Sequence, residues 1–261
     1  MSVELEIDTF LDGMVHRYMS VKSRIREISD EEVVPFVYLC DYFIDKPHIL
    51  SYREWKSLLV TFAYILHKKM KNRDASNHQL RKCHLKACNK VLDVLVIAAH
   101  EPDMDCCREL IWAAATLLLE WHCHFLSDIV TEEENEIYRY CVKTLSKTPI
   151  IPETNENILH TICSWTHLSI AGQYSFVSCP DPSVLEIMIV IGGANIRALD
   201  NRGNTPLECL KMNLEDRVNE VVSIDDEEKG KVLDCIRILH QYHGHTSAAA
   251  EELVDHIRNT L

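Results

Sequence analysis

Cysteine and histidine are the side chains of this sequence with the widest chemical range. The chain of 261 residues contains 11 cysteines and 14 histidines, which could ligate zinc or pair as a thiolate–imidazole nucleophile. They come close in sequence at Cys83–His84 with Cys88, at Cys106–Cys107 and at His122–His124. None of these groups has the paired Cys-x-x-Cys or His spacing of a zinc site, and adjacent residues of a helix point in different directions. We therefore expect reduced thiols and packed imidazoles, and no metal or other cofactor.

Catalytic motifs are missing from the sequence. It has no G-x-S-x-G elbow, no glycine-rich phosphate loop and no His-Glu-x-x-His pair, and only 7 glycines in all. The carboxylate run Asp225–Glu228 has no histidine beside it, so we interpret it as a solvated loop. The first expectation is a protein without enzymatic activity. A cysteine enzyme stays open as an alternative, because a catalytic Cys and its His meet only in space.

The charge balance argues against nucleic-acid and membrane partners. The chain has 27 Lys and Arg against 40 Asp and Glu, a net charge of -13, whereas phosphate surfaces attract clustered Lys and Arg. The short basic run Lys68–Arg73 is interpreted as a solvated helix end. Residues Met1–Asp8 carry acids where a signal peptide carries bases, and no apolar run reaches the roughly 18 residues of a membrane span. We expect a cytoplasmic protein, with the nucleus as a second location.

The glycines show which parts of the chain are helical. Gly13 is followed by no glycine until Gly172, so the first 150 residues are expected to be almost entirely helix. Hydroxyl side chains three positions before a Glu mark helix starts at Ser29, Ser51 and Thr131. The predicted helices cover residues 3–26, 30–45, 51–71, 77–100, 104–129 and 131–146. Joined by short loops, they would form helical hairpins, and the 47% of hydrophobic residues is enough to fill a core.

The predicted helix 104–129 has a clear buried stripe. Its apolar side chains recur at helical spacing at Leu110, Ala114, Leu117, Leu118, Trp121 and Phe125. We interpret this row as core, because a cofactor pocket would need convergent polar groups that the row lacks.

Residues 192–210 have the pattern of a turn between two helices. Gly193 can adopt the positive φ that ends a helix. After a short extended run, Asp200 and Gly203 fit a tight turn. This turn is the most specific local pattern of the chain.

A helix start follows directly. Thr205 can cap the helix with its hydroxyl, Pro206 suits the first helical position, and Leu207 begins a buried stripe. These residues match the first three positions of the ankyrin signature T-P-L-H-x-A. Glu208 and Leu210 replace the His and the Ala, so we expect a divergent or terminal ankyrin repeat.

A second, more divergent copy of this pattern comes earlier. Leu159 and His160 keep two positions of the signature, and Asp181 with Pro182 begins the outer helix of the pair. The two copies lie 48 residues apart, about 15 more than the ankyrin period of about 33. We expect the surplus to form a loop over residues 166–179.

The remaining segments complete an all-α prediction. A second inner helix ends near Asn213, an outer helix covers Lys231–Tyr242, and Ser247–Leu261 forms a closing helix. We therefore predict a solenoid of two domains. Residues 1–150 form a helical-hairpin, tetratricopeptide-like block, and residues 151–261 form two degenerate ankyrin repeats with insertions.

These features resemble a known family. Leu159–His160, the 48-residue spacing and Gly193–Leu207 are similar to the C-terminal half of the feminization (Fem) family of ankyrin proteins, over about residues 140–245. In the family these repeats follow a tetratricopeptide-like region, and Phe62–Leu66 is similar to a short run in that region. Family members are substrate receptors of cullin-2 RING ubiquitin ligases that recognise C-terminal degrons. The resemblance thus implies elongin and cullin-2 as partners.

The sequence also departs from the family. The N-terminal ankyrin array that binds degrons does not precede Met1, and Thr246–Leu261 contains neither the elongin box nor the cullin box. Ser57–Phe62 approaches the elongin-box pattern but ends in Phe62 where the family has Cys. The resemblance therefore supports the architecture more directly than it supports ligase activity.

The expected function is a non-enzymatic protein-interaction module. Inner helices and turns of stacked repeats present variable side chains to a partner. The candidate partner-binding residues are Trp165, His167, Arg197, Asn201 and Arg202. If the two arginines project together, an acidic or carboxylate-ended peptide is the expected ligand. The alternative is a structural or dimerisation scaffold, which would use an uncovered apolar face of residues 3–26.

Overall fold

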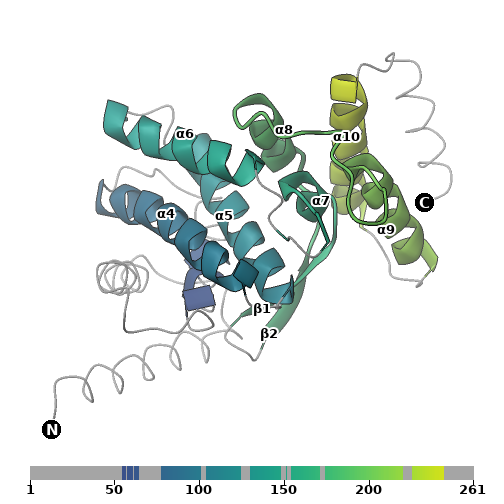
Figure 1. Ribbon diagram of the computed structural model, residues 1–261, viewed down its shortest axis with the longest axis horizontal. Coiled ribbons are helices and arrows are strands. Elements are labelled where there is room, and N and C mark those ends of the chain that lie inside the picture. The colour runs from purple at the N-terminus through teal and green to yellow at the C-terminus, as the bar shows by residue number, and fades with distance from the viewer. Residues whose placement is uncertain are drawn as a thin grey trace, which may run out of the picture.

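The computed structural model shows a mostly helical protein with one small β-hairpin (Figure 1). It describes residues 55–56, 58–60, 62–64, 78–100, 104–124, 130–147, 151, 154–170, 174–219 and 225–243. The elements are α4 (His78–His100), α5 (Met104–His124), α6 (Glu132–Lys147), α7 (Ile158–Ile162), β1 (Thr166–Ile170), β2 (Tyr174–Ser178), α8 (Pro182–Val190), α9 (Pro206–Asn219) and α10 (Asp226–His243). The predicted helices 3–26, 30–45 and Ser247–Leu261 lie outside the described residues.

Helix α5 is the central element of the described part. It contacts α4, α6, α7, α8 and β1, and between Cys106 and Trp121 every residue is buried or half-buried. A helix that is buried on all sides belongs to the core. The predicted stripe is confirmed for its five described members, Leu110, Ala114, Leu117, Leu118 and Trp121, and Phe125 lies outside the described residues.

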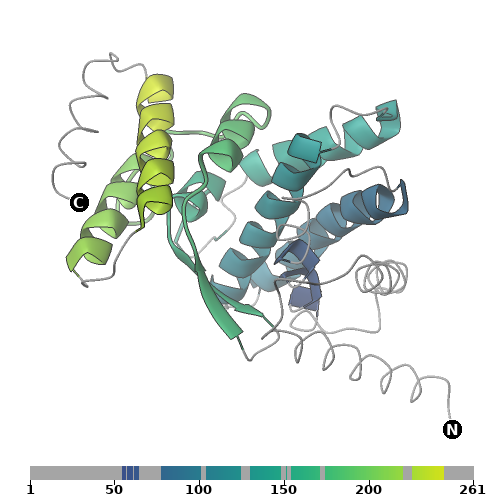
Figure 2. The ribbon, with the colours of Figure 1, turned by 180° about the vertical axis from the view of Figure 1, so that it is seen from behind.

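The apolar core continues from this helical block into the later helices. One cluster of buried side chains extends from Trp55 to Leu239. Helix α8 contributes Val184, Leu185 and Met188 to it and contacts α5, α6, α7 and α10. Figures 1 and 2 show α4, α5 and α6 together at one end, α9 and α10 at the other, and α7 with α8 between them.

Two buried polar side chains in this core, His84 and Glu109, have defined partners. His84 Nε2 lies 2.5 Å from the Leu117 carbonyl oxygen, and its ring meets Trp121 edge-on at 6.0 Å. Lys56 forms an ion pair with Glu109, which is buried on α5. These contacts place His84 in core packing, in agreement with the sequence interpretation of the histidines.

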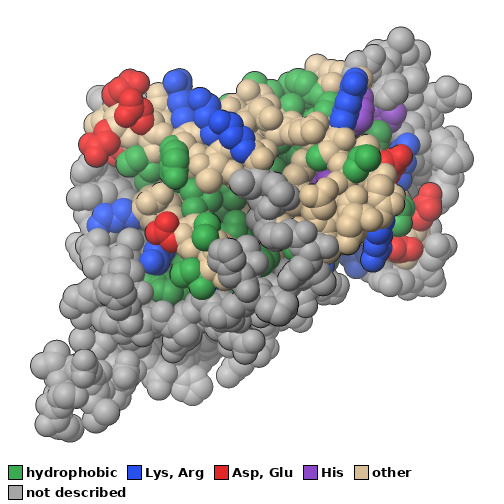
Figure 3. Space-filling view, in the orientation of Figure 1, with side chains coloured by type: hydrophobic (Ala, Val, Ile, Leu, Met, Phe, Trp, Pro, Cys, Tyr) green, Lys and Arg blue, Asp and Glu red, His purple; other side chains and the backbone are tan. Residues whose placement is uncertain are grey.

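The start signals that fall on described residues are confirmed, whereas those predicted at Ser29 and Ser51 lie outside the described residues. Thr131 and Glu134 form a reciprocal capping box at α6, with both backbone N–H groups satisfied by the partner's side chain. Asp181 caps α8 by accepting from two backbone N–H groups, and Pro182 occupies the first turn. Helix α6 carries acids in its first turn and Lys147 in its last, as the helix dipole favours. Figure 3 shows the acidic cluster at one end of the upper face and a row of basic side chains beyond it.

The expected loop over residues 166–179 is wrong, because most of this segment forms an antiparallel hairpin. β1 and β2 pair from Thr166 with Ser178 to Ile170 with Tyr174. Leu168 and Ile170 on β1, and Tyr174 and Phe176 on β2, are large apolar residues spaced two apart, the period-2 spacing of a strand pair. The prediction gave more weight to the glycine and serines of the segment than to this spacing.

Two helix boundaries also differ from the prediction. Helix α9 continues to Asn219, beyond the expected end near Asn213. Helix α10 begins at Asp226, so Asp226, Glu227 and Glu228 form its first turn and are not a solvated loop. The Asp225 side chain accepts a hydrogen bond from the Glu228 N–H and caps the helix. Acids in a first turn are stabilised by the N-terminal dipole, which is the physical reason for this correction.

We expect Leu117→Ala to lower the free energy of unfolding by about 2–5 kcal/mol, because it leaves a cavity in α5 where the side chain is fully buried. The matched control is Val96→Ala on α4, which truncates a side chain that is 62% exposed and should change stability by less than about 0.5 kcal/mol. Urea unfolding followed by circular dichroism measures both. Equal effects would contradict the central position of α5.

Candidate functional site

The segment between α8 and α9, residues 191–205, is here named the connecting turn. It begins where Gly193, at φ 70°, ends α8. The Gly193 N–H donates to the Ile189 carbonyl, and the Ala194 N–H donates to the Met188 carbonyl, a pattern that closes helix ends with glycine. Gly192 has a different role, because a Cβ there would lie 1.8 Å from the Ser146 Oγ of α6. The two glycines therefore fix both the direction of the turn and its close approach to α6.

Asp200 holds the tip of the connecting turn. Its carboxylate accepts hydrogen bonds from the N–H groups of Arg202 at 2.9 Å and Asn204 at 2.8 Å. The Asp200 N–H donates to the Asn204 carbonyl, and Gly203 adopts φ 85°. Burial alone would raise the pKa of the Asp200 carboxyl, but the two backbone donors outweigh it and hold the pKa below its ordinary value. The predicted tight turn is confirmed.

Helix α9 starts as the sequence predicts. Pro206 is its first residue and Leu207 is buried. Thr205 and Glu208 form a capping box, with the Thr205 N–H donating to Glu208 Oε2 at 2.6 Å and the Glu208 N–H donating to Thr205 Oγ1. The bonds from Thr205 lower the pKa of Glu208. Glu208 therefore has its own structural role where the ankyrin signature has His.

Helix α7 starts with a capping box that the sequence reading missed. Asn157 is the cap and accepts from the N–H groups of Leu159 and His160. In return, the Asn157 N–H donates to His160 Nδ1 at 3.1 Å. The other ring nitrogen of His160, Nε2, lies 3.0 Å from the Asn204 carbonyl oxygen. This buried histidine thus joins the start of α7 to the connecting turn.

The connecting turn is bound along its length to the segment 154–160. Besides the His160 contact, Asn155 Nδ2 donates to the Leu199 carbonyl at 2.7 Å and Asn157 Nδ2 donates to the Asn195 carbonyl at 2.9 Å. The Asn201 N–H donates to the Thr154 carbonyl at 2.8 Å. The described residues thus include four hydrogen bonds across these two segments. Side-chain amides supply two of them, and no periodic pattern in the sequence signals this pairing.

The structure brings three of the five predicted partner-binding residues together. Arg197, Asn201 and Arg202 are all exposed on the connecting turn. The Arg197 guanidinium donates to the His243 carbonyl at the end of α10, at 3.1 Å. The described residues contain no partner for the Arg202 guanidinium, so it is the more available of the two arginines.

The other two predicted residues lie elsewhere. Trp165 is half-buried before β1, and the guanidinium of Arg217 on α9 lies 5.7 Å from its ring centroid, in cation–π range. Trp165 therefore packs between α9 and the hairpin. His167 lies in β1, paired with Val177.

Seven thiols of the described part have pKa values raised above the ordinary value of a cysteine. Burial raises the pKa of Cys141 to about 12, and burial with the nearby Asp200 carboxylate raises that of Cys209 to about 12. Burial also raises the pKa values of Cys88, Cys123, Cys163, Cys179 and Cys235. A raised pKa keeps the sulfur protonated at neutral pH, where only the thiolate is a strong nucleophile. No group of three or more His, Cys, Asp or Glu among the described residues could hold a metal ion.

A cavity that the sequence did not predict lies beside α5. It has a volume of about 340 Å³, and its lining comes from Tyr64, α5, α7, the hairpin and the starts of α8 and α10. Asp181 and Asp225, which cap those two helices, both line it. In the sequence, Asp181 and Asp225 are separate residues 44 positions apart, and only the fold places both beside the same cavity.

Comparison of the chain with protein-family models, with curated proteins and with solved structures finds no match. Among the described helices none combines the length and the apolar character that crossing a membrane requires.

We expect Gly193→Ala to destabilise the protein by about 1 kcal/mol, because an alanine Cβ is strained at φ 70° although no atom lies within 4 Å of it. Gly230→Ala in α10 is the matched control, since its Cβ also meets nothing within 4 Å but the backbone there is helical. That change should stabilise by about 0.5–1 kcal/mol. Urea unfolding of both variants should give opposite signs, and a shared sign would contradict the left-handed turn.

The stability of the connecting turn should depend on pH through Asp200. The pKa of this carboxyl is lower in the folded protein than its ordinary value of 3.8. Its ionised form therefore contributes stability above about pH 4, and that contribution is lost as the pH falls through the folded-state pKa. We expect Asp200→Asn to be less stable than the wild type at neutral pH. The difference in unfolding free energy should shrink below pH 4, and a constant difference would contradict this assignment.

Proposed function

We propose that this chain is a non-enzymatic protein-interaction module that binds its partner through the connecting turn. One observation carries the proposal: the turn exposes Arg197, Asn201 and Arg202 on a backbone held by hydrogen bonds from Asp200 and from the segment 154–160. A side chain presented on a fixed backbone loses little freedom on binding, and this raises affinity. The exposed arginines are the kind of residue that anchors interfaces.

An acidic or carboxylate-ended peptide is the proposed ligand of the turn. The Arg202 guanidinium is exposed, and no partner for it lies among the described residues. A guanidinium pairs with a carboxylate in a planar, bidentate geometry. Arg197 lies five residues earlier in the same turn, where its bond to the His243 carbonyl holds it in place. The two together would recognise two separated acidic groups, or one acid beside a free terminus.

The proposal also includes a repeat-type architecture, in which helix pairs flank the connecting turn. Three features of the turn support this part of the proposal: Gly193 at positive φ, Asp200 at the tip and Thr205–Pro206 at the helix start. With the resemblance to the Fem family, this makes elongin and cullin-2 the first partners to test and a cytoplasmic or nuclear location the expected one. On this reading the chain contributes to a ubiquitin-ligase substrate receptor.

Two alternatives have different support. A cysteine-dependent enzyme needs a stabilised thiolate, and the raised pKa values of the thiols oppose it. A scaffold or dimerisation module has one observation in its favour, since the consecutive residues Val96 and Ile97 of α4 are both exposed. Sedimentation velocity separates this alternative from the proposal, because a scaffold that dimerises through α4 would give a dimer that Val96→Glu dissociates.

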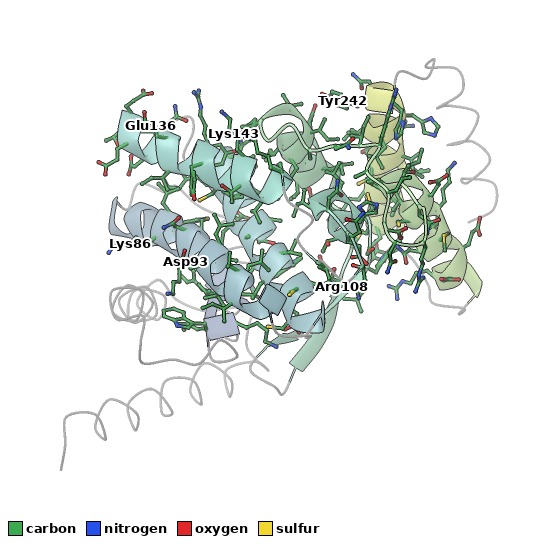
Figure 4. The ribbon with its side chains drawn as sticks, in the orientation of Figure 1. Lys86, Asp93, Arg108, Glu136, Lys143 and Tyr242 are labelled. Carbon is green, nitrogen blue, oxygen red and sulfur yellow. The ribbon has the colours of Figure 1, made fainter. Side chains whose placement is uncertain are left out.

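We expect Arg202→Glu to reduce capture of the partner by roughly tenfold or more, as loss of an interface anchor does. Affinity capture on the full chain, read by mass spectrometry for elongin and cullin subunits and for other proteins, measures this. The control is Lys143→Glu, an equal charge reversal at an exposed position of α6, away from α9 and α10 (Figure 4). If both variants capture the same proteins as the wild type, the turn is not the binding surface. Capture without elongin or cullin would refute the ligase part alone.

A further inference from the structure

The cavity beside α5 is preformed, and apolar side chains make up part of its lining. Its apolar lining comes from α5, α7, β2 and α8, through Ile111, Ala115, Leu119, Ile162, Val177 and Val184. The indole Nε1 of Trp112 on α5 donates to Ser178 Oγ on β2 at 2.8 Å, and both residues line the cavity. This bond holds the hairpin against α5, so the lining keeps its arrangement without a ligand. A volume of about 340 Å³ is at the low end for ligand pockets and suits one large side chain.

The rim of the cavity is acidic. Its acidic residues are Asp181, Asp225, Glu227 and Glu228, and the described lining also contains the cationic Lys231. Lys231 pairs with Glu227 at 2.8 Å, which leaves a charge of -3. The N-termini of α8 and α10 each contribute roughly +0.5, so the rim still holds about two negative charges. A cationic group at this rim is therefore attracted.

Two of these acids have capping roles, and Glu228 has none. Asp181 and Asp225 accept from backbone N–H groups at the starts of α8 and α10. The Glu228 carboxylate is half-exposed and has no partner within the described residues. Its field reaches into the cavity, since burial first and then this carboxylate raise the pKa of the lining residue Cys179 to about 12.

A buried hydroxyl in the lining lacks a partner. Thr161 of α7 lines the cavity, is 3% exposed, and its Oγ1 makes no hydrogen bond to any described residue. Two other hydroxyls of the lining are paired, since Ser164 donates to the His160 carbonyl and Ser178 accepts from Trp112. Buried polar groups in native proteins are hydrogen-bonded with few exceptions. The unpaired Thr161 hydroxyl therefore indicates a ligand with a polar atom that reaches the apolar interior.

We infer that this cavity binds a basic peptide segment of a partner protein through a tyrosine side chain, whose ring fills the apolar interior and whose hydroxyl pairs with Thr161 Oγ1. Lys or Arg residues on either side of that tyrosine then meet the acidic rim formed by Asp181, Asp225 and Glu228. An aromatic ring with a polar tip is the side chain that satisfies an apolar wall and a buried hydroxyl together. This site adds a second binding surface to the proposed interaction function and does not depend on the connecting turn.

The distribution of the acids favours a peptide over a small molecule. The carboxylates belong to the first turns of two different helices, α8 and α10. Asp225 and Glu227 are exposed, while Thr161 and Ile111 are buried. A ligand that fills the interior with one ring and also reaches these separate acids must carry cationic groups on both sides of the ring. A peptide backbone with flanking lysines has this geometry.

A mutant cycle on the full chain tests the tyrosine contact. Fluorescence anisotropy measures binding of the fluorescein-labelled peptide Lys-Lys-Tyr-Lys-Lys and of its version with Phe in place of Tyr. We expect the wild-type protein to prefer the Tyr peptide by about fivefold, the value of one net hydrogen bond. Thr161→Val has nearly the same shape but no hydroxyl, so it should abolish the preference. Urea unfolding of this variant, expected to equal or exceed the wild type in stability, shows that it folds.

The acidic rim is tested by charge reversal. Glu228→Lys should lower the affinity for the Tyr peptide by about tenfold, and higher salt should lower the affinity of the wild type for that peptide. Glu133→Lys is the matched control, because it also removes a first-turn carboxylate, from α6, and should leave binding unchanged. Arg202→Glu should also leave it unchanged, so failure of the turn proposal and failure of this one remain distinguishable.

Several outcomes would overturn the inference. The Tyr contact is wrong if the wild type binds the Tyr and Phe peptides equally or if Thr161→Val keeps the preference. The peptide assignment is wrong if N-acetyltyrosinamide alone binds as tightly as the peptide. The site as a whole is wrong if no peptide binds, or if the peptide with Glu in place of every Lys binds as well as the basic one.

Discussion

The burial of α5 on every side is the constraint on which the rest of the structure depends. The helix contacts α4, α6, α7, α8 and β1, so the positions of these elements depend on their fit to α5. Arg108, near the start of α5 in Figure 4, pairs with Glu156 at 2.9 Å. Glu156 directly precedes Asn157, the cap of α7. The ion pair thus connects the core helix to the segment that holds the connecting turn.

The connecting turn takes its conformation from amide side chains as well as from glycine. Asn155 has φ 55°, a conformation that Asn tolerates better than most residues, and its side chain reaches the Leu199 carbonyl. Asn157 both caps α7 and donates to the Asn195 carbonyl. One amide can accept and donate at the same time, so a few asparagines satisfy the backbone of two adjacent segments. This is why a turn without regular secondary structure can present its arginines on a fixed backbone.

The sequence predicted what depends on neighbouring residues and missed what depends on distant ones. The caps at Thr131, Asp181 and Thr205 are formed within three residues, and all three are correct. The 166–179 hairpin had a local signal in the spacing of its apolar side chains, but glycine and serine outweighed it. The link between His160 and the Asn204 carbonyl joins residues 44 positions apart, and no single-sequence pattern encodes such a contact. The helical character of the chain was therefore predictable, while the arrangement of the candidate sites was not.

Helix α8 relates the two candidate binding surfaces. At its start, Asp181 caps the helix and lines the cavity, and at its end Gly192 and Gly193 begin the connecting turn. Between these ends Val184, Leu185 and Met188 are buried in the common core. Because both ends are hydrogen-bonded and the middle is packed, the helix holds the acidic rim and the basic turn at a fixed separation. The two surfaces have opposite charge, so a partner with an acidic and a basic segment could engage both only if the distance between its segments matches the length of α8.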